Sequence, residues 1–307
     1  MEEKLMNIEQ LEYIVEIAKT GSLSAASASL HVTQSALSQS VSRLEEELGV
    51  KIFQRTHAGA HATEEGRRVL DKALDALHAI DELKDSALND RNLIQGELDV
   101  ASFPGVMSLL VKAVSSIKQD YPLLKVNVEE SDSRSILEAI RSNRIGLGLI
   151  AMYTKDIEKL SGLAFEPIVQ GKLVICANKN SPIAQHAAVH PKELLKYEFA
   201  LYRDNFLEDF LIDYKSTYGE LSILFSTNNG EAIQTALNEN LAVTIGHDFS
   251  FYGSSRLLGE PFVLVDIAPY AQQPMQVGWV KSEKKQMPSL YQLCVNKFKH
   301  EFDRNRI

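Results

Sequence analysis

The sequence predicts an α/β protein with an all-α-dominated amino-terminal domain: a winged helix-turn-helix, a long linker helix and a two-lobed α/β domain. Three observations lead to this prediction. Residues 21–49 have the pattern of two short helices around a tight turn, residues 63–92 continue as one amphipathic helix, and the chain beyond Gly96 alternates strand-like and helical segments. The expected domains are 1–63, 64–95 and 96–307, with a first lobe at about 96–166 and 269–307 and a second at about 167–268.

The second short helix is expected to start after Thr33, whose hydroxyl can cap the first turn, and to stop at Gly49. Its apolar residues recur at three- and four-residue spacing in one stripe: Ala36, Leu37, Val41, Leu44 and Leu48. The opposite face carries uncharged polar side chains that can hydrogen-bond base edges in a major groove: Gln34, Ser35, Ser38, Gln39 and Ser42. An ordinary surface helix would carry interspersed Lys and Glu, so the pattern favours DNA recognition. A Ser- and Ala-rich hairpin that is only a structural bundle element stays open.

The segments on either side favour a winged domain. An amphipathic helix precedes the pair and is expected to end at Thr20 and Gly21; its apolar residues are Ile8, Leu11, Ile14, Val15 and Ala18. Downstream, residues 52–56 and 60–63 can pair as two short strands around His57, Ala58 and Gly59. A winged helix-turn-helix results.

Positions across the first third of the chain carry a family signature: Leu11, Gly21, Ser22, Leu23, Ala25, Ala26, Leu30, Gln34, Ser35, Ala36, Leu37, Ser38, Leu44, Glu45, Leu48, Gly49, Phe53, Arg55, Thr63 and Gly66. They resemble the amino-terminal signature of LysR-type transcriptional regulators. The resemblance implies a sequence-specific regulator of double-stranded DNA, of bacterial type, that responds to a small-molecule effector and forms a homodimer or homotetramer. RNA polymerase is a further partner that it implies. Ala58 and Ala62 stand where the family often has a basic residue and a Leu, so the wing offers less to phosphate.

The polar face and the resemblance together give a set of expected DNA contacts. Gln34, Ser35, Ser38 and Gln39 are expected to read bases, while Thr33, Arg43, Arg55 and the wing position the duplex. The full set is Ser24, Thr33, Gln34, Ser35, Ala36, Ser38, Gln39, Arg43, Arg55 and His57. The net charge of −9 opposes binding to nucleic acid as a whole. Phosphate contact is local, however, and nearby cations can gather at the duplex: Arg43, Lys51, Arg55, Arg67 and Arg68.

From Thr63 to about Asn92 one helix is expected, with apolar residues near heptad positions: Leu70, Ala73, Leu77, Ile80 and Ala87, widened by Leu74, Leu83 and Leu88. Such a seam can be buried against the same helix of a second subunit or against the chain's own carboxyl-terminal domain. The family resemblance favours the dimer. The DNA-binding domains of the two subunits would then bind two half-sites about one helical turn apart.

Beyond Gly96 the strands expected at 96–103, 125–131 and 145–151 and the helices at 106–120 and 133–143 form a βαβαβ unit with a parallel sheet. A second unit is expected from strands at 173–177, 199–202, 222–227 and 241–246, with helices at 207–218 and 231–239. Strands at 263–267 and 276–280 carry the chain back, and a helix at 289–302 ends it. Two lobes joined by two crossovers resemble a periplasmic-binding-protein-like effector domain.

Ligands of parallel sheets bind where strands end and helices begin, because unpaired amides and helix dipoles point there. The expected effector contacts are Ser102, Phe103, Pro104, Ser131, Thr227 and Asn228 at such ends, with Tyr202, Arg203 and His247 on other strands of the second lobe. Ser102 aligns with the family's usual ligand-facing position, and Arg203 can pair with a carboxylate, so a small organic anion is expected. Ser131 and Asn228 can equally be helix caps, and Arg203 a solvated loop charge. Gly146 stands where the family frequently has Asp, so any contact made by that Asp is absent.

No enzyme activity, cofactor or metal is expected, because the chain has no glycine-rich phosphate loop, nucleophile elbow or paired Cys motif. His186 and His190 have zinc-helix spacing but lack the acidic residue between them. Cys176 and Cys294 are expected to be buried small hydrophobes. Without an apolar span long enough for a bilayer, or an export signal after Met1, a cytoplasmic location is expected. Two alternatives stay open: an enzyme in the second domain, and a ligand-binding module without specific DNA recognition, which would not need the polar face.

Overall fold

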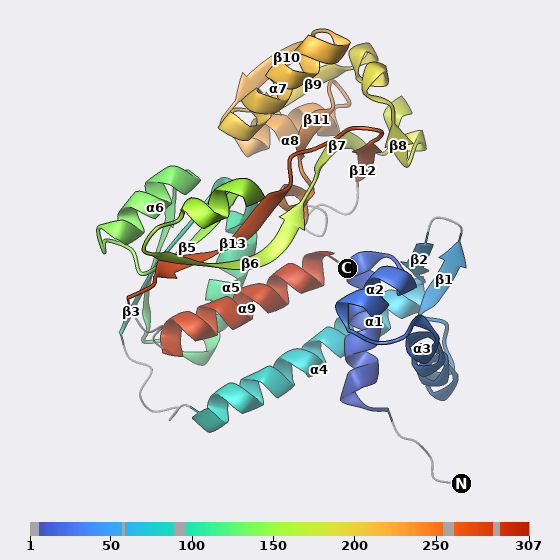
Figure 1. Ribbon diagram of the computed structural model, residues 1–307, viewed down its shortest axis with the longest axis vertical. Helices are drawn as coiled ribbons and strands as arrows, with labels where there is room; N and C mark the ends of the chain where they lie inside the picture. Colours follow the sequence, from blue (N-terminus) through green and yellow to red (C-terminus); the bar gives the residue numbers. More distant parts are fainter. Residues whose placement is uncertain (1–5, 57–58, 89–95, 254–260, 285–288, 307) are drawn as a thin grey trace. The chain divides into compact units, whose positions relative to one another are not determined.

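The structure is a computed structural model that describes residues 6–56, 59–88, 96–253, 261–284 and 289–306. The chain divides into two units, of which the first contains residues 1–96, 112–124 and 288–307 and the second residues 97–111 and 125–287. Figure 1 labels their elements. The predicted fold class, a mainly helical amino-terminal part followed by an α/β domain, is confirmed.

The helix-turn-helix lies at the start of the first unit: α1 is Ile8–Thr20, α2 is Leu23–Ser29 and α3 is Gln34–Leu48. The predicted cap is present, since the Thr33 hydroxyl accepts from the amide of Ala36 at 3.2 Å. Gly21 ends α1 and Gly49 ends α3 with φ of 65° and 69°, the left-handed conformation that favours glycine. Local chemistry therefore sets the ends of these helices.

The core of this domain is one cluster that joins the helices to the wing: Leu11, Ile14, Val15, Ile17, Ala26, Leu37, Val41, Leu44, Ile52, Phe53, Ala60, Leu70, Ala73 and Leu74. The wing pairs β1 (Phe53–Thr56) with β2 (Gly59–Ala62) in antiparallel register, as predicted. The predicted apolar stripe of α3 is wrong at both ends, because Ala36 and Leu48 are exposed. The neighbouring elements cover only the middle turns of the helix.

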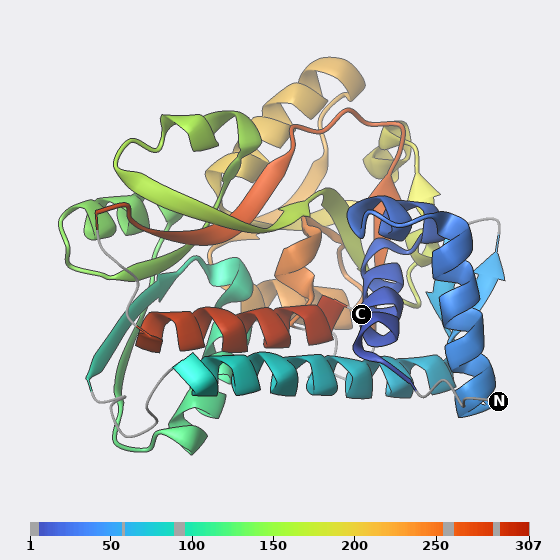
Figure 2. The same cartoon turned by 60° about the horizontal axis from the view of Figure 1, so that its bottom comes forward.

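Helix α4 (Glu64–Leu88) follows the wing, and α9 (Ser289–Arg306) runs alongside it (Figure 2). The rings of His78 and His300 lie with centroids 4.1 Å apart between these helices, and Arg304 of α9 lies 3.7 Å from the carboxylate of Asp75. Of the expected seam, Leu70, Ala73 and Leu74 are buried in the amino-terminal core, whereas Leu83 is 71% exposed. The first part of the seam is therefore covered within one chain.

The first lobe of the second unit has a five-stranded sheet in the order β4-β3-β5-β13-β6. Its strands are β3 (Glu97–Ser102), β4 (Lys125–Glu130), β5 (Leu147–Tyr153), β6 (Leu163–Gly171) and β13 (Met275–Ser282), and its helix is α6 (Ser133–Arg141). Helix α5 (Met107–Asp120) follows β3 and continues from the second unit into the first. Strand β3 pairs in parallel with β4 and β5, which confirms the predicted βαβαβ unit. Strand β6 was not predicted, because Pro167 interrupts its pattern; the sheet tolerates the proline since β6 lies at its edge.

The second lobe has a four-stranded sheet in the order β11-β7-β12-β8 and a parallel pair of β9 with β10. Its elements are β7 (Leu173–Asn178), β8 (Ala188–Val189), β9 (Glu198–Tyr202), α7 (Asn205–Tyr218), β10 (Ser222–Thr227), α8 (Gly230–Asn238), β11 (Thr244–His247) and β12 (Phe262–Ile267). The described 3₁₀ helices are η2 (Pro104–Val106) and η3 (Thr154–Lys159) in the first lobe, and η4 (Pro182–Gln185), η5 (Pro191–Lys196) and η6 (Asp248–Phe251) in the second. The chain crosses between the lobes from β6 to β7 and from β12 to β13, as predicted (Figure 1).

Candidate nucleic-acid interface and ligand site

The uncharged polar face of α3 is exposed to solvent. Its exposed residues are Thr33, Gln34, Ser35, Ala36, Gln39, Ser42 and Arg43, with Ser38 half-buried and Ser24 of α2 also exposed. On the other side of α3, Leu37 and Leu44 are fully buried, which fixes the rotation of the helix. The hydroxyls of Thr33 and Ser35 hydrogen-bond at 3.2 Å, so the first turn is ordered by its own side chains. The polar face can therefore meet a groove without refolding.

Four of the five cations expected near phosphate have described side chains. Arg43, Lys51, Arg67 and Arg68 are exposed. Lys51 pairs with Glu45 at 2.7 Å, and Arg68 lies 3.8 Å from Glu65. The exposed pair of Arg68 with Glu65 is worth about 0–1 kcal/mol, so a phosphate can displace it, whereas the carboxylate that pairs with Lys51 is buried.

Two of the expected DNA contacts, Arg55 and His57, belong to the wing. The backbone of Arg55 pairs with Ala60 in the wing ladder. The side chain of Arg55 and the whole of His57 and Ala58 lie outside the described residues. Their contacts with DNA stay predictions.

Glu45 is a residue of this domain to which the sequence analysis assigns no role. Its carboxylate is buried and accepts from the amides of Ile52 at 2.9 Å and Phe53 at 3.2 Å and from the ammonium of Lys51. Burial would raise the pKa of Glu45, but the hydrogen bonds from Lys51, Phe53 and Ile52 together hold the pKa below its ordinary 4.5. The carboxylate thus ties the end of the recognition helix to the start of the wing. Its position four residues after Val41 puts it on the apolar side of the helix, although its charge argues against burial.

We expect Glu45→Gln to lower the free energy of unfolding by about 1–3 kcal/mol at neutral pH, because the amide is a weaker acceptor for these donors. A folded-state pKa below 4.5 means that the carboxylate stabilises the fold above pH 4.5 and loses this effect as the pH falls through the folded-state pKa. The difference between the parent protein and the variant should therefore shrink below pH 4.5. Urea unfolding across this range measures it, with the exposed neighbour variant Glu46→Gln as control. A difference that persists undiminished at the acid end would contradict the assignment.

On the first lobe, the structure brings the predicted strand ends together. The amide of Ser131, after β4, donates to the carbonyl of Ser102 at 3.1 Å. The Ser102 side chain is fully buried and donates to the Phe103 carbonyl at 2.9 Å, while Pro104 is exposed at the start of η2. The alternative reading of Ser131 as a helix cap is wrong, because Asp132 caps α6.

On the second lobe, Tyr202 and Thr227 are register partners at the ends of β9 and β10. The amide of Arg203 donates to the Thr227 carbonyl at 2.9 Å, so the backbone of this exposed residue lies at that strand end. Asn228 is exposed and is not the cap of α8, since Asn229 caps that helix. Four predicted residues thus lie at or just after the ends of two paired strands: Tyr202, Arg203, Thr227 and Asn228.

His247 ends β11 within a series of aromatic rings that links the two lobes. It stacks on Phe249 with centroids 5.2 Å apart and lies 6.3 Å from Phe206. Phe206, in α7 of the second lobe, meets Tyr153 of the first lobe at 5.2 Å, and Phe249 meets Phe103 at 5.8 Å. Burial lowers the pKa of His247 to about 4, so its imidazole is neutral at neutral pH.

Tyr153, Phe206 and Phe249 are not among the predicted site residues. Tyr153 ends β5 just as Ser102 ends β3, so the rule that ligands meet strand ends could have found it. Phe206 lies in the first turn of a helix and Phe249 in a short 3₁₀ helix, and neither position follows a regular pattern. Their proximity depends on the arrangement of both lobes.

Carboxylates gather around two tyrosines at this junction. Burial is the largest of the causes that together raise the pKa of Tyr153 to about 12. The others are the carboxylate of Asp209, which accepts from its hydroxyl at 3.2 Å, and the charges of Asp204 and Asp213. The pKa of Tyr202 is also raised, by burial and then by nearby carboxylates including Asp204. The charge near Tyr153 favours a neutral or cationic group, whereas Arg203 favours an anion.

The parts of the chain that the structure describes contain no group of three or more His, Cys, Asp or Glu that could hold a metal ion. No helix within the same ranges is long and apolar enough to cross a membrane. Cys176 and Cys294 are buried and unpaired, and burial raises the pKa of each thiol to about 12, as expected of small core residues.

An exposed recognition helix with a wing, followed by a two-lobed α/β domain, defines a DNA-binding regulator with a ligand-binding domain. Residues 8–67 match the bacterial regulatory helix-turn-helix protein family of the lysR type, and residues 91–302 match the LysR substrate binding domain. The chain belongs to the LysR family of transcriptional regulators. It is thus a DNA-binding transcriptional regulator with an effector-binding domain, and the predicted resemblance is confirmed.

Relatives of similar length support this assignment. The chain is 26% identical over 276 residues to the HTH-type transcriptional regulator YvbU of Bacillus subtilis (strain 168), with 89% of this chain and 91% of that protein covered. Among solved structures, HinK, a LysR family transcriptional regulator from Pseudomonas aeruginosa, is 20% identical, with a TM-score of 0.54 and 97% and 99% of the two chains covered. Full-length CbnR, solved in complex with its target DNA, is 19% identical, with a TM-score of 0.50 and coverage of 96% and 100%. At these identities the structures show a shared fold.

Proposed function

We propose that the exposed face of α3 reads base pairs in the major groove through Gln34, Ser35, Ser38 and Gln39. The observation that carries this proposal is an uncharged, hydrogen-bonding helix face that the buried stripe of the same helix holds toward solvent. Thr33, Ser24 and Ala36 flank the reading residues. Arg43 at the side of the helix, with Arg55 and His57 of the wing, would position the duplex through phosphate.

We infer that two chains pair through α4, so that the working unit is a homodimer or homotetramer. Leu83 supports this inference, because covering an exposed apolar side chain of a long helix with a second helix stabilises the pair.

The proposed activity is binding without catalysis. Because its proposed partner is genomic DNA, with RNA polymerase as a second partner at the promoter, the protein would act in the cytoplasm.

We propose that the effector binds at the junction of the two lobes and shifts the equilibrium between lobe arrangements. This shift would change how the paired DNA-binding domains are placed on DNA and how far they bend it. Ser102, Phe103, Pro104 and Ser131 would meet it from the first lobe. Tyr202, Arg203, Thr227, Asn228 and His247 would meet it from the second. Arg203 supports a small organic anion, and the carboxylates near Tyr153 make a cationic effector the specific alternative.

The test of the DNA-binding proposal is binding of the purified protein to the region upstream of its own gene and to random duplex of equal length, at two salt concentrations. Specific regulators typically bind their site about 10³–10⁷ times more tightly than non-specific DNA. A preference for the upstream region supports the proposal. Equal affinity for both duplexes would leave a ligand-binding module without specific DNA recognition.

For the effector, we expect a screen of small organic anions to include compounds that raise the melting temperature, since a ligand at about 100 times its Kd stabilises the folded state by about 2.7 kcal/mol. Arg203→Ala should abolish this rise, because the exposed guanidinium group is the proposed partner of the anion. Arg141→Ala, at an exposed arginine of α6, is the matched control and should keep it. A rise with amines in place of anions, unaffected by Arg203→Ala, would assign the carboxylates near Tyr153 as the recognition groups.

A further inference from the structure

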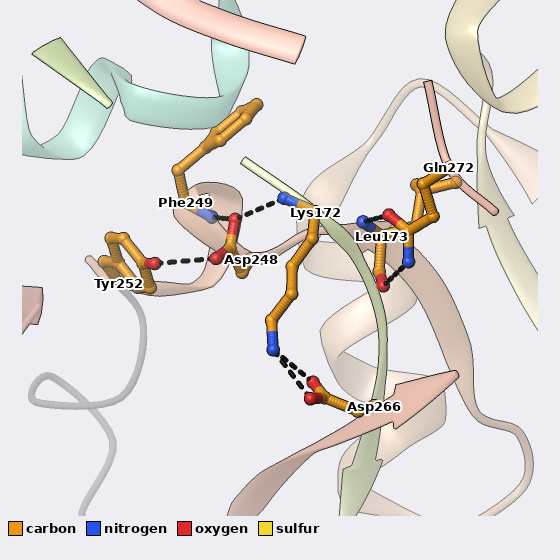
Figure 3. A network of polar contacts seen from close by, with 7 residues as sticks. All are labelled: Lys172, Leu173, Asp248, Phe249, Tyr252, Asp266 and Gln272. Carbon is orange, nitrogen blue, oxygen red and sulfur yellow. Dashed lines mark hydrogen bonds and ion pairs between the residues drawn. The ribbon is translucent and has the colours of Figure 1, made fainter. Parts of the chain in front are cut away.

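Three segments of the second unit meet at Lys172, in the first crossover between the lobes (Figure 3). The first is the crossover itself, Gly171 to Leu173, between β6 and β7. The second is the return crossover between β12 and β13, which contains Gln272. The third is η6, which contains Asp248. The return crossover and η6 are each joined to the first crossover by hydrogen bonds that lie outside the regular sheet ladders.

Gln272 binds the backbone of the first crossover from the return crossover. The amide of Leu173 donates to its side-chain oxygen at 2.5 Å, and its side-chain nitrogen donates to the carbonyl of Leu173 at 3.0 Å. The side chain thus replaces a peptide group of a neighbouring strand (Figure 3). The side chain of Gln272 thus joins the two crossovers directly.

Asp248 joins the same crossover to η6. Its carboxylate accepts from the amide of Lys172 at 3.2 Å, from the amide of Phe249 at 2.9 Å and from the hydroxyl of Tyr252 at 2.9 Å. Its own amide donates to the Lys172 carbonyl at 2.9 Å. The ammonium of Lys172 also pairs with Asp266, but that pair is half exposed and contributes little.

In the sequence, Asp248 stands between His247 and Phe249, the two stacked aromatic residues at the junction of the lobes. The Phe249 ring is packed tightly on the first crossover, because a methyl group added at Gly171 would lie 2.4 Å from two of its ring carbons. If the backbone of Phe249 shifts, either its ring must rotate away from Gly171 or the crossover must move with it. The aromatic series and the crossover are mechanically connected at this point.

We propose that Gln272 is a tie that sets the resting angle between the lobes, and that Asp248 transmits a displacement of His247 and Phe249 to that tie. This inference rests on the proposed binding of an effector at the lobe junction. Gln272 and Asp248 are positioning residues: they contact the crossover, and an effector that moves the aromatic rings would reach the lobe angle through them. The bonds of Gln272 are only partly buried, so water can replace them when the lobes change arrangement.

The test is made without any effector, so that it is independent of ligand binding. Spin labels at Arg141→Cys in α6 and Asn238→Cys in α8 report the distance between lobes, and the buried native cysteines leave the labelling specific. Gln272→Ala should broaden the distance distribution or add a second population. It should also speed hydrogen exchange at the Leu173 amide by about tenfold or more, because that amide loses its acceptor. Gln170→Ala, the matched control, removes an exposed side-chain amide from the end of β6 next to the same crossover and should leave both readouts as in the parent.

If Gln272→Ala does not fold, Gln272→Glu provides the same test, because it keeps the acceptor for the Leu173 amide but places a carboxylate oxygen against the Leu173 carbonyl. Broadening in Gln272→Ala or Gln272→Glu, with an unchanged control, supports the tie. A distribution as narrow as the parent's, with the Leu173 amide still protected, overturns it. Asp248→Asn tests the second step: it should reduce the change in lobe distance that a stabilising anion causes, without abolishing the rise in melting temperature. A full distance change in Asp248→Asn would remove Asp248 from the pathway, whereas no ligand response in the parent would refute the proposed function instead.

Discussion

Gln34→Ala is expected to weaken binding to the specific DNA site by about 10- to 100-fold, and Ser38→Ala by a smaller factor in the same direction. The reason is that a glutamine amide can bond an adenine with two hydrogen bonds, worth about 1–3 kcal/mol of discrimination, whereas a serine hydroxyl forms fewer. Binding to random duplex should not change, because neither side chain carries charge. Fluorescence anisotropy with both duplexes at two salt concentrations measures the effect.

Arg43→Ala gives the contrasting result that makes this experiment decisive. Loss of one phosphate contact should weaken binding to both duplexes alike and reduce the salt dependence by about one unit of slope. Gln34→Ala should leave that slope unchanged. If Gln34→Ala lowered affinity for specific and random DNA equally, the exposed face of α3 would be a phosphate surface and base reading would have to come from elsewhere.

The elements that the sequence predicts best are those whose ends are set by local chemistry. The hydroxyl of Thr33 and the left-handed Gly49 act at the two ends of α3, and the left-handed Gly21 acts at the end of α1. These signals, like the spacing of the core residues, are visible in the sequence. The error at Ala36 and Leu48 has a different origin. Periodicity identifies the side of a helix that is apolar, but how far neighbouring elements extend along that side depends on tertiary packing.

The contacts that the sequence could not predict join residues that are far apart in the chain. Gln272 and Leu173 are 99 residues apart, and Asp248 and Lys172 are 76 apart. None of these residues belongs to a motif, because a glutamine that binds a backbone and a surface glutamine look the same in sequence. The same holds for the aromatic rings at the lobe junction, whereas the strand ends at Ser102 and Thr227 follow from the order of strands and helices.

Glu45 shows an intermediate case. Its position on the apolar stripe was visible, but its charge made burial unexpected, since a buried carboxylate needs donors. The donors are the Ile52 and Phe53 amides, which the turn after α3 brings back to the helix. The link between recognition helix and wing is thus short in sequence but depends on the exact path of one loop, and Gly66 meets that same loop from the other side.

Gly66→Ala is expected to destabilise the amino-terminal domain by about 3 kcal/mol, although alanine is a better helix former than glycine by about 1 kcal/mol. Gly66 is the third residue of α4, and a methyl group there would lie 2.0 Å from the carbonyl oxygen and 2.9 Å from the Cα of Ile52. These are backbone atoms, so no side chain can rotate away. The start of α4 is also fixed, because the Thr63 hydroxyl accepts from the Gly66 amide at 2.8 Å and the Thr63 amide donates to the Ile52 carbonyl at 2.9 Å.

Steric overlap therefore outweighs helix propensity at Gly66, and Gly230→Ala separates the two effects. Gly230 is the first residue of α8 and has open space where a methyl group would lie, so only propensity acts there and alanine should be neutral or stabilising by up to about 1 kcal/mol. Urea unfolding followed by circular dichroism compares both variants with the parent. Because displacement of the loop at Ile52 also removes the donors of Glu45, Gly66→Ala should weaken DNA binding as well, and Gly230→Ala should not. A Gly66→Ala protein as stable as the parent would show that α4 and the wing can separate without cost, and that the wing is not rigidly attached to the recognition helix.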